Sequence, residues 1–449
     1  MKASRTVLRA AVSTALGARR LIWAGIRGDD AESLSDLPQF DASFTIINSY
    51  RRRPLHASLA YEDMTGVRVD LETWDIDEHP GATATVAFRQ GLLRAMAVPC
   101  ALLPYRPSQF LSALAFARQD RCLSLGLFGS QQYAFEHKPW VESALDRHGV
   151  RTLGWTYIAD EDQLDAERLL ADGPIMVRRS RTSGGEGLVR VSTADELGAA
   201  WPRQAEAFAS VSPYVSEALP VNVGATVWDS GVTVHLPSVQ LIGIPECVSR
   251  PFGYCGNDFG AAKALDDAEL DAIEATTITV GNWLRSHGYR GTFGVDFLLV
   301  EGVPVFTEIN PRFQGSTRSS AQLAVESDRP CLPLEHIAAM MGLTPPALPP
   351  LRERVREVDD LAHLVVHNTW DRPASVDVDG LRAAVRGADS TARLDAELPQ
   401  GVLCAPGATL GRFTVRSRLT DSGFELREDV AAALAAWVRT ALHDDKGVA

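Results

Sequence analysis

Apolar residues recur at every second position along two neighbouring runs of the chain. In residues 291–300 the alternating positions are Phe293, Val295, Phe297 and Leu299. In residues 303–309 they are Val303, Val305, Thr307 and Ile309. A period of two is typical of half-buried strands, and the intervening Glu301-Gly302 is typical of a tight turn. The pattern therefore predicts a β-hairpin.

Polar side chains gather on one face of this predicted hairpin. Folding about the turn places Asp296 opposite Glu308, within one residue, and Asn310 lies on the same strand face as Glu308. Two carboxylates and an amide oxygen suit Mg²⁺ or Mn²⁺ bound together with substrate phosphates. Arg312 follows, and its guanidinium can hold a phosphate or a carboxylate. The sequence thus predicts metal ligands at Asp296, Glu308 and Asn310; the alternative is an acidic surface hairpin.

A glycine-rich loop lies between two apolar runs further upstream. Residues 175–177 lead into Arg178, the loop spans 182–187, and a second run covers 188–191. Glycines let backbone N–H groups approach a phosphate closely. No Gly-Lys-Ser/Thr sequence closes the loop, so it is not a Walker A motif. The alternative to a phosphate-binding loop is a plain hairpin turn.

Together these motifs resemble the ATP-grasp fold. A carboxylate followed by Glu-x-Asn-x-Arg, here Asp296 and then residues 308–312, is similar to the metal-binding end of that fold. The glycine-rich loop resembles the flap over the β- and γ-phosphates, although lysine is usual where Arg178 or Arg179 stands. Lys138, before a helix that opens with Pro139, resembles the lysine that contacts the α-phosphate. The resemblance covers about 135–320.

The resemblance also implies which residues bind ATP. Residues 212–215 look like the linker that holds adenine, and a polar residue shortly after it contacts the ribose. Glu217 and Asn222 remain alternatives for the ribose contact. The implied ATP-binding residues are Lys138, Arg178, Ser183, Gly184, Gly185, Tyr214, Val215, Glu217 and Asn222.

A long segment rich in Gly, Pro and aromatic residues covers 238–260. Long irregular segments inside compact domains are often binding loops. We therefore expect part of this segment to face a second substrate. The candidate substrate-binding residues are Arg250, Tyr254, Asn257 and Asp258, with Ser316 beyond the hairpin.

Length and patterning predict an α/β and α+β multidomain protein of about three domains. Residues 1–130 alternate strands and helices, which indicates a parallel α/β domain preceding the ATP-grasp domain. We expect the ATP-grasp domain at 131–345, with its flap subdomain at about 150–220. Prolines at 344–350 mark a boundary, and 346–449 read as a small C-terminal α+β domain.

Composition narrows the classes of partner and compartment. The net charge of −13 argues against nucleic acid as a partner. The six cysteines form no CxxC pair, which favours reduced thiols in the cytoplasm. No apolar run approaches the ~20 residues of a membrane helix. We expect a cytoplasmic protein that acts on small molecules. A homodimer is compatible with this expectation.

The resemblance further implies the reaction. The segments 238–243 and 308–317 look like those of pheganomycin-type peptide ligases in natural-product biosynthesis. Such an enzyme phosphorylates a carboxylic acid (an amino acid or analogue) with ATP and Mg²⁺, and an amine or peptide acceptor then displaces phosphate. Arg312 would be the catalytic residue that holds the reacting carboxylate. The alternatives are an acyl or small-molecule kinase and a non-catalytic module that binds ATP or an amino acid.

Overall fold

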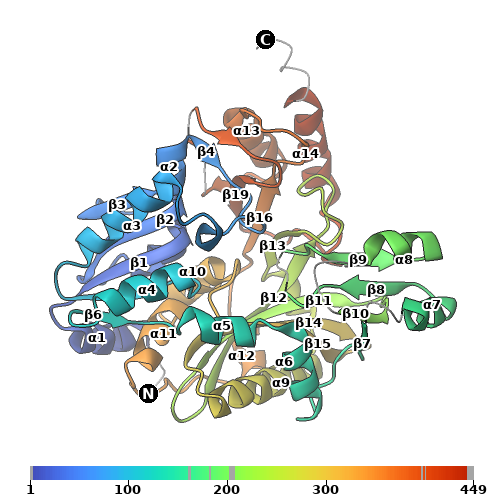
Figure 1. Cartoon of the computed structure of the whole chain (residues 1–449), viewed down its shortest axis with the longest axis horizontal. Helices are drawn as coiled ribbons and strands as arrows, with labels where there is room; N and C mark the ends of the chain where they lie inside the picture. The colour runs from blue at the N-terminus through green and yellow to red at the C-terminus, as the bar shows by residue number, and fades with distance from the viewer. Residues whose placement is uncertain are drawn as a thin grey trace.

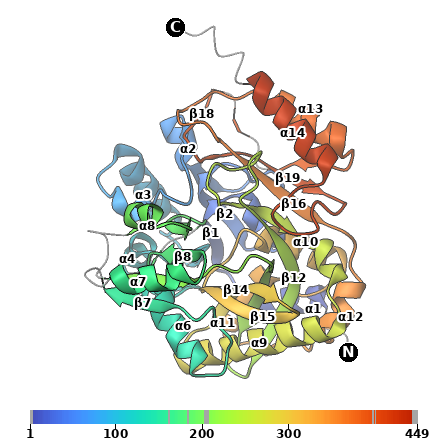
Figure 2. The ribbon, with the colours of Figure 1, turned by 90° about the vertical axis from the view of Figure 1, so that its right-hand side faces the viewer.

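The computed structural model describes residues 4–159, 163–181, 184–201, 208–395, 398–399 and 401–441. The N-terminal part lies at one side, the flap at the other, and the C-terminal helices at the top of the view (Figure 1). A large antiparallel sheet runs between them, as the perpendicular view also shows (Figure 2). No helix in the described ranges is long and apolar enough to cross a membrane.

The N-terminal part is a parallel sheet covered by helices, as its sequence predicted. The strand order is β3-β2-β1-β5-β6, and all four pairings are parallel. The strands are β1 (Arg20–Arg27), β2 (Phe40–Ile47), β3 (Ala57–Ala60), β5 (Cys100–Pro104) and β6 (Cys122–Ser124). The helices are α1 (Arg5–Leu16), α2 (Tyr61–Thr65), α3 (Thr83–Ala95), α4 (Gln109–Ala117) and α5 (Gly129–Phe135). The next helix, α6 (Lys138–Asp146), packs instead against strand β15 (Val303–Asn310) of the large antiparallel sheet.

The flap is a four-stranded antiparallel sheet of order β7-β10-β8-β9. Its strands are β7 (Thr156–Ala159), β8 (Ile175–Arg178), β9 (Leu188–Val191) and β10 (Phe208–Pro213), with helices α7 (Gln163–Ala171) and α8 (Ala194–Ala200). The pairing of β8 with β9 confirms the two strands predicted on either side of the glycine-rich loop.

The central sheet has the order β15-β14-β11-β12-β13-β16-β19-β17 and is antiparallel. Its strands are β11 (Leu219–Val227), β12 (Val232–Ile242), β13 (Tyr254–Asp258), β14 (Gly291–Val300), β15 (Val303–Asn310), β16 (Ala362–His367), β17 (Arg393–Leu394) and β19 (Thr409–Val415). The short strands β4 (Val67–Arg68) and β18 (Leu403–Cys404) pair with each other.

Helix α9 (Asp267–Ser286) packs against β11, β12 and β15. It begins at a capping box, in which Asp266 accepts a hydrogen bond from the Glu269 N–H and the Glu269 side chain accepts one from the Asp266 N–H. Its apolar face, with Ile273, Val280 and Leu284, is buried in the largest core. The helices beyond it are α10 (Thr317–Glu326), α11 (Leu332–Met340) and α12 (Leu351–Arg356).

The C-terminal segment contains the predicted strands and terminal helix, but it does not form a sheet of its own. Strand β16 pairs with β13, so the last strands extend the central sheet. Helices α13 (Val378–Ala388) and α14 (Glu428–Ala441) pack against each other. The domain boundaries at 130 and 345 stay predictions.

His336 joins the N-terminal part to the central sheet. Its Nδ1 accepts a hydrogen bond from the Thr292 N–H, so Nε2 carries the proton and donates to the Leu125 carbonyl at 2.7 Å. Burial lowers the pKa of His336 to about 4. The folded protein therefore holds this imidazole neutral.

Because of His336, we expect the free energy of unfolding to decrease as the pH is lowered from about 6.5 to about 4. The unfolded chain takes up a proton near 6.5, whereas the folded chain does so near 4, so protonation favours unfolding by roughly 3 kcal/mol. His336→Gln should flatten that part of the profile of unfolding temperature against pH. His148→Gln, at an exposed histidine, is the control; equal slopes for both variants would contradict the assignment.

Candidate active site

The β14–β15 hairpin has the predicted turn and carries the two carboxylates opposite each other. Val300 pairs with Val303 across Glu301 and Gly302, which both have positive φ, of 50° and 77°. This is the geometry of a two-residue hairpin turn. A bulge then shifts the register, so that Asp296 pairs with Glu308. Directly opposed residues lie on one face of a sheet, and both side chains open into the same cavity.

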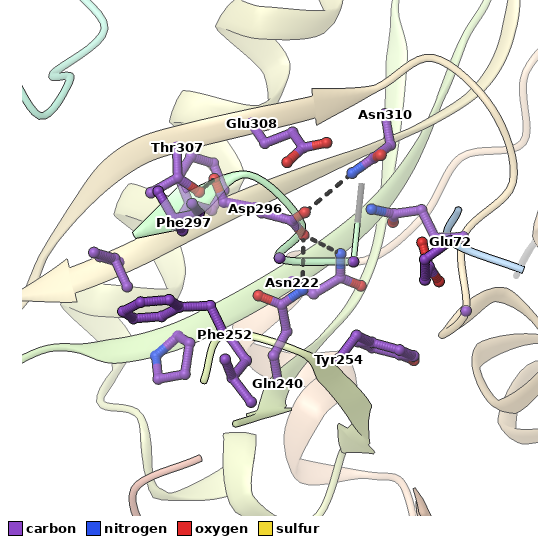
Figure 3. A pocket seen from close by; sticks show the side chains of 18 of the residues that line it. Glu72, Asn222, Gln240, Phe252, Tyr254, Asp296, Phe297, Thr307, Glu308 and Asn310 are labelled. Atoms are coloured by element: carbon purple, nitrogen blue, oxygen red, sulfur yellow. Dashed lines mark hydrogen bonds between the residues drawn. The ribbon is translucent and has the colours of Figure 1, made fainter. Parts of the chain in front are cut away.

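Asp296 lies at the centre of a polar cluster (Figure 3). Its Oδ1 accepts hydrogen bonds from Asn222 at 2.5 Å and from Gln240 at 3.2 Å. Its Oδ2 accepts one from Asn310 at 3.0 Å. Burial and repulsion from Glu308 raise the pKa of Asp296 to about 7, against the hydrogen bond from Asn222. A cation bound beside Asp296 and Glu308 would therefore stabilise their ionised forms.

The donor set fits a magnesium ion held together with substrate phosphates. In the described residues no three His, Cys, Asp or Glu side chains gather into a metal cage. Magnesium needs only one or two carboxylates when phosphates complete its coordination. Asp296 and Glu308 would supply these, and turning the Asn310 amide would present its oxygen. Burial, with the nearby charge of Glu308, raises the pKa of Asp296, and a cation bound here would favour its ionised form.

Lys138 and Arg178 bring positive charge to the same cavity. Lys138 is buried, and its Nζ lies 2.6 Å from Glu308 Oε2. Arg178 is also buried, pairs with Glu142 at 2.7 Å and lies over the Trp155 ring at 3.9 Å from its centroid. Both cations line the cavity. Their contacts with ATP remain predictions, since each has a protein carboxylate as its present partner.

Gly184 and Gly185 line the cavity at the tip of the flap, with φ of 56° and 77°. A Cβ on Gly184 would meet the Glu72 side chain, and a Cβ on Gly185 would lie 2.0 Å from the Phe252 carbonyl oxygen. The close approach at Gly185 is thus to the backbone of the segment before β13. Ser183 lies outside the described residues.

We expect Gly185→Ala to raise the KM for ATP and to lower turnover. The added Cβ would push the flap away from the Phe252 carbonyl, and the positive φ adds strain. Steady-state kinetics with varied ATP measure the effect. Gly198→Ala is the control, because a Cβ there meets no atom within 4 Å. Unchanged ATP kinetics in Gly185→Ala would mean that the loop is an ordinary turn.

The apolar end of the cavity lies beside the flap and suits an aromatic base. Tyr214 and Val215 line the cavity, and their contact with adenine stays a prediction. The Arg190 guanidinium lies over the Tyr214 ring, 4.5 Å from its centroid. Glu217 is exposed and does not line the cavity. Asn222 accepts a hydrogen bond from Ser316 and donates one to Asp296. Of the two alternatives for the ribose contact, Glu217 lies outside the cavity, whereas Asn222 lines it beside the carboxylates, and the ribose contact stays a prediction.

The predicted substrate residues divide into two groups. Asn257 and Ser316 line the cavity. Asp258 does not, because its carboxylate accepts hydrogen bonds from the N–H groups of Ala261, Leu419 and Thr420. Arg250 does not line it either, since its guanidinium pairs with Asp70 at 2.7 Å. The predictions of Asp258 and Arg250 as substrate contacts are thus corrected to structural roles.

Arg312 lines the cavity just beyond the end of β15, and its side chain is half-buried. Its Nη1 donates to the Phe313 carbonyl at 3.1 Å, and its Nε lies 3.5 Å from Glu136. Its guanidinium thus faces the same cavity as Glu308, whose charge acts on it.

Several residues that line the cavity were not predicted from the sequence. Gln240 lies in strand β12, which also contains Thr233, His235 and Ser238, so its polar side chain alone does not mark it as a site residue. Others come from the N-terminal part and carry no local signature. These are Ile26, Arg27, Leu71, Glu72, Tyr105 and Arg106. The cavity encloses about 320 Å³, which is within the usual size of ligand sites.

The comparisons with known proteins agree with this geometry. Residues 171–316 match the family model described as ATP-grasp domain. A formate-dependent phosphoribosylglycinamide formyltransferase of Synechococcus sp. (strain CC9311) is 25% identical over 211 residues, which are 44% of this chain and 49% of the relative. The chain thus aligns with about half the length of the curated relatives it matches.

Two solved structures share the fold over nearly the whole chain. An N5-carboxyaminoimidazole ribonucleotide synthetase, solved as an ADP complex, has a TM-score of 0.60 at 11% identity and covers 96% of this chain and 98% of its own. The biotin carboxylase domain of the Hydrogenobacter thermophilus 2-oxoglutarate carboxylase, with MgADP and bicarbonate, has a TM-score of 0.63 at 13% identity, covering 90% and 87%. The chain therefore has the ATP-grasp fold and contains an ATP-grasp domain.

Proposed function

We propose that the protein is an ATP-dependent carboxylate–amine ligase. The observation that carries this proposal is the pairing of Asp296 with Glu308 in a cavity that also holds Lys138, Arg178 and the glycine flap. Paired carboxylates beside buried cations suit phosphoryl transfer from a nucleotide. The curated relative is named as formate-dependent, and formate is a carboxylate, which is consistent with this class.

In this mechanism the chain positions reactants and compensates charge. Tyr214 and Val215 contact the base, while Lys138, Arg178 and the flap N–H groups contact the phosphates. The substrate carboxylate attacks the γ-phosphate, ADP leaves, and an acyl phosphate forms. The amine then attacks the acyl carbon, inorganic phosphate leaves, and the amide remains. Such a reaction needs no protein nucleophile, because orientation and charge supply the rate.

Mg²⁺, when bound at Asp296, Glu308 and Asn310, neutralises phosphate charge. Arg312, which lines the cavity, holds the acyl oxygen or the substrate carboxylate as its charge changes. Gln240 and Asn222 hold Asp296 in position through their hydrogen bonds. We further propose that the amide is a peptide bond formed in natural-product biosynthesis, as in the pheganomycin-type ligases that residues 238–243 and 308–317 resemble.

The test is ADP release with a panel of carboxylic acids, with and without amines, followed by mass spectrometry of the product. ADP and an amide that form only when both partners are present support the ligase. ADP with the acid alone indicates an acyl kinase. ATP binding without ADP under any condition indicates a binding module, and both of these results overturn the proposal.

A further inference from the structure

The cavity has a second lobe against the N-terminal sheet. Arg27 is the last residue of β1, and Tyr105 and Arg106 follow directly after β5. These two strands are neighbours, but the chain continues from β1 towards β2 and from β5 towards β6, on opposite sides. Such a point in a parallel sheet leaves a crevice at the carboxyl ends of the strands where ligands bind.

Two arginines offer hydrogen-bond donors to this lobe. Arg27 is buried, and within the described part of the chain its side chain makes one hydrogen bond, from Nε to Asp30 at 3.3 Å. Both of its Nη groups are therefore available to a ligand. The Nη2 group of Arg312 is likewise available to a ligand, because the contacts of Arg312 in the described part of the chain use Nη1 and Nε. Buried guanidinium groups of this kind hold carboxylates tightly.

Glu72 brings a negative charge to the same lobe. Burial raises the pKa of Tyr254. The positive charge of Arg27 lowers this pKa and the negative charge of Glu72 raises it, so Arg27 and Glu72 both lie close enough to act on the Tyr254 hydroxyl. Burial likewise raises the pKa of Tyr105, which Arg27 and Arg312 lower and Glu72 raises. All five side chains line the cavity, and Figure 3 places Glu72 and Tyr254 on the side away from Phe297.

The position of Glu72 is held by contacts that reach the central sheet. Its backbone N–H donates to Asp70 Oδ1 at 3.1 Å, while Asp70 Oδ2 pairs with Arg250 at 2.7 Å. Arg250 belongs to the segment between β12 and β13. Arg250 is thus a positioning residue for Glu72, through a partly exposed ion pair outside the cavity.

We propose that this lobe is the subsite of the amine substrate and that it binds an α-amino acid, with the carboxylate on Arg27 and the amino group beside Glu72. The inference rests on the proposed ligase function. Arg27 and Glu72 bring opposite charges to this one lobe, where both act on Tyr105 and Tyr254, and a zwitterion carries the matching pair of charges. A phosphorylated amine would bring a dianion next to Glu72, and the like charges would repel. The proposal therefore distinguishes this chain from ligases whose amine substrate is a ribonucleotide.

Binding experiments test the subsite without any turnover. Thermal-shift measurements with ADP, Mg²⁺ and each of the twenty proteinogenic amino acids select the tightest binder. Calorimetry then compares that amino acid with its α-carboxamide and its des-amino acid. We expect each analogue to bind about 10-fold more weakly or worse, because each loses one charged contact. If no amino acid binds, or if both analogues bind equally well, the proposal fails.

The variant Glu72→Gln separates the two charged contacts. We expect it to weaken the amino acid about 10-fold, to remove the preference over the des-amino acid, and to keep the preference over the carboxamide. Glu78→Gln, at an exposed residue of the same region, should match the wild type. Affinity for MgADP reports whether the flap beside Glu72 is intact. The wild-type ligand series decides the question if the variant does not fold.

Ribose 5-phosphate is the competing probe. If it binds better than any amino acid, and Glu72→Gln strengthens its binding, the lobe is a phosphate site and the proposal is wrong. The subsite and the ligase can fail separately. Amino-acid binding as expected, without amide formation in the presence of ATP, would refute the ligase alone. Amide formation from amines without a carboxylate, unaffected by Glu72→Gln, would refute the subsite alone.

Discussion

Glu308→Gln should reduce turnover by at least about 10²-fold while the protein stays folded. The substitution keeps the shape of the side chain but removes one of the two anionic groups that face each other on the hairpin. It also removes the carboxylate that lies 2.6 Å from Lys138. Lys138 keeps Asp296 as a neighbouring negative charge, so the fold has a remaining partner for it.

The measurement is ADP release at saturating ATP, beside the unfolding temperature of each variant. Glu301→Gln is the matched control, because Glu301 occupies the turn of the same hairpin and does not line the cavity. The control should retain wild-type turnover. ADP formation by Glu308→Gln at the wild-type rate would remove Glu308 from the site and leave the hairpin a structural element.

Arg312→Lys should bind ATP nearly normally and yet lose roughly 10²-fold or more in turnover. Arginine presents a planar fork that can span two oxygens, whereas lysine presents a single point charge. The fork matters most when the substrate carboxylate becomes an acyl phosphate and then a tetrahedral adduct, because negative charge moves onto oxygen at that stage. Arg312 is half-buried in the cavity wall, where partial exclusion of water strengthens such contacts.

ATP affinity by calorimetry and amide formation at saturating substrate together test this role. Arg290→Lys, at a cation outside the cavity, is the control. Weaker ATP binding with full turnover at saturation would make Arg312 a nucleotide anchor only. If neither quantity changes, Arg312 makes no contact with the reactants.

Patterns within short segments predicted much of the central sheet and the flap. The hairpin at 291–310 could be read from its period of two and its Glu-Gly turn, since strand side chains alternate between two faces. The flap could be read from a glycine-rich loop between two apolar runs. Both motifs are local, and local backbone preferences determine them.

The alternation of residues along the hairpin does not by itself determine that Asp296 pairs with Glu308. The turn alone would set Asp296 opposite Thr307, and the bulge beside Phe297 moves the register by one residue. A bulge depends on how the neighbouring strands pack, so the sequence predicted this pairing only within one residue.

Asp258 and Arg250 were predicted from the local sequence to contact a second substrate, but they do not line the cavity. Both are polar residues in an irregular segment, which is the pattern of a binding loop. Asp258 instead caps backbone N–H groups of Leu419 and Thr420, and Arg250 pairs with Asp70. Their partners lie far away in the sequence, so no local signal distinguishes them from Asn257, which does line the cavity.

The sequence by itself determined the ATP-grasp motifs and the carboxylate face of the hairpin, because these depend on period, turn chemistry and residue type. The composition of the second lobe came from the tertiary structure alone. Arg27, Glu72 and Tyr105 meet Arg312 and Tyr254 only when the end of β1, the segment after β4 and the end of β5 are packed against the central sheet. Electrostatic contacts act through space, and their partners are set by packing between segments that are distant along the chain.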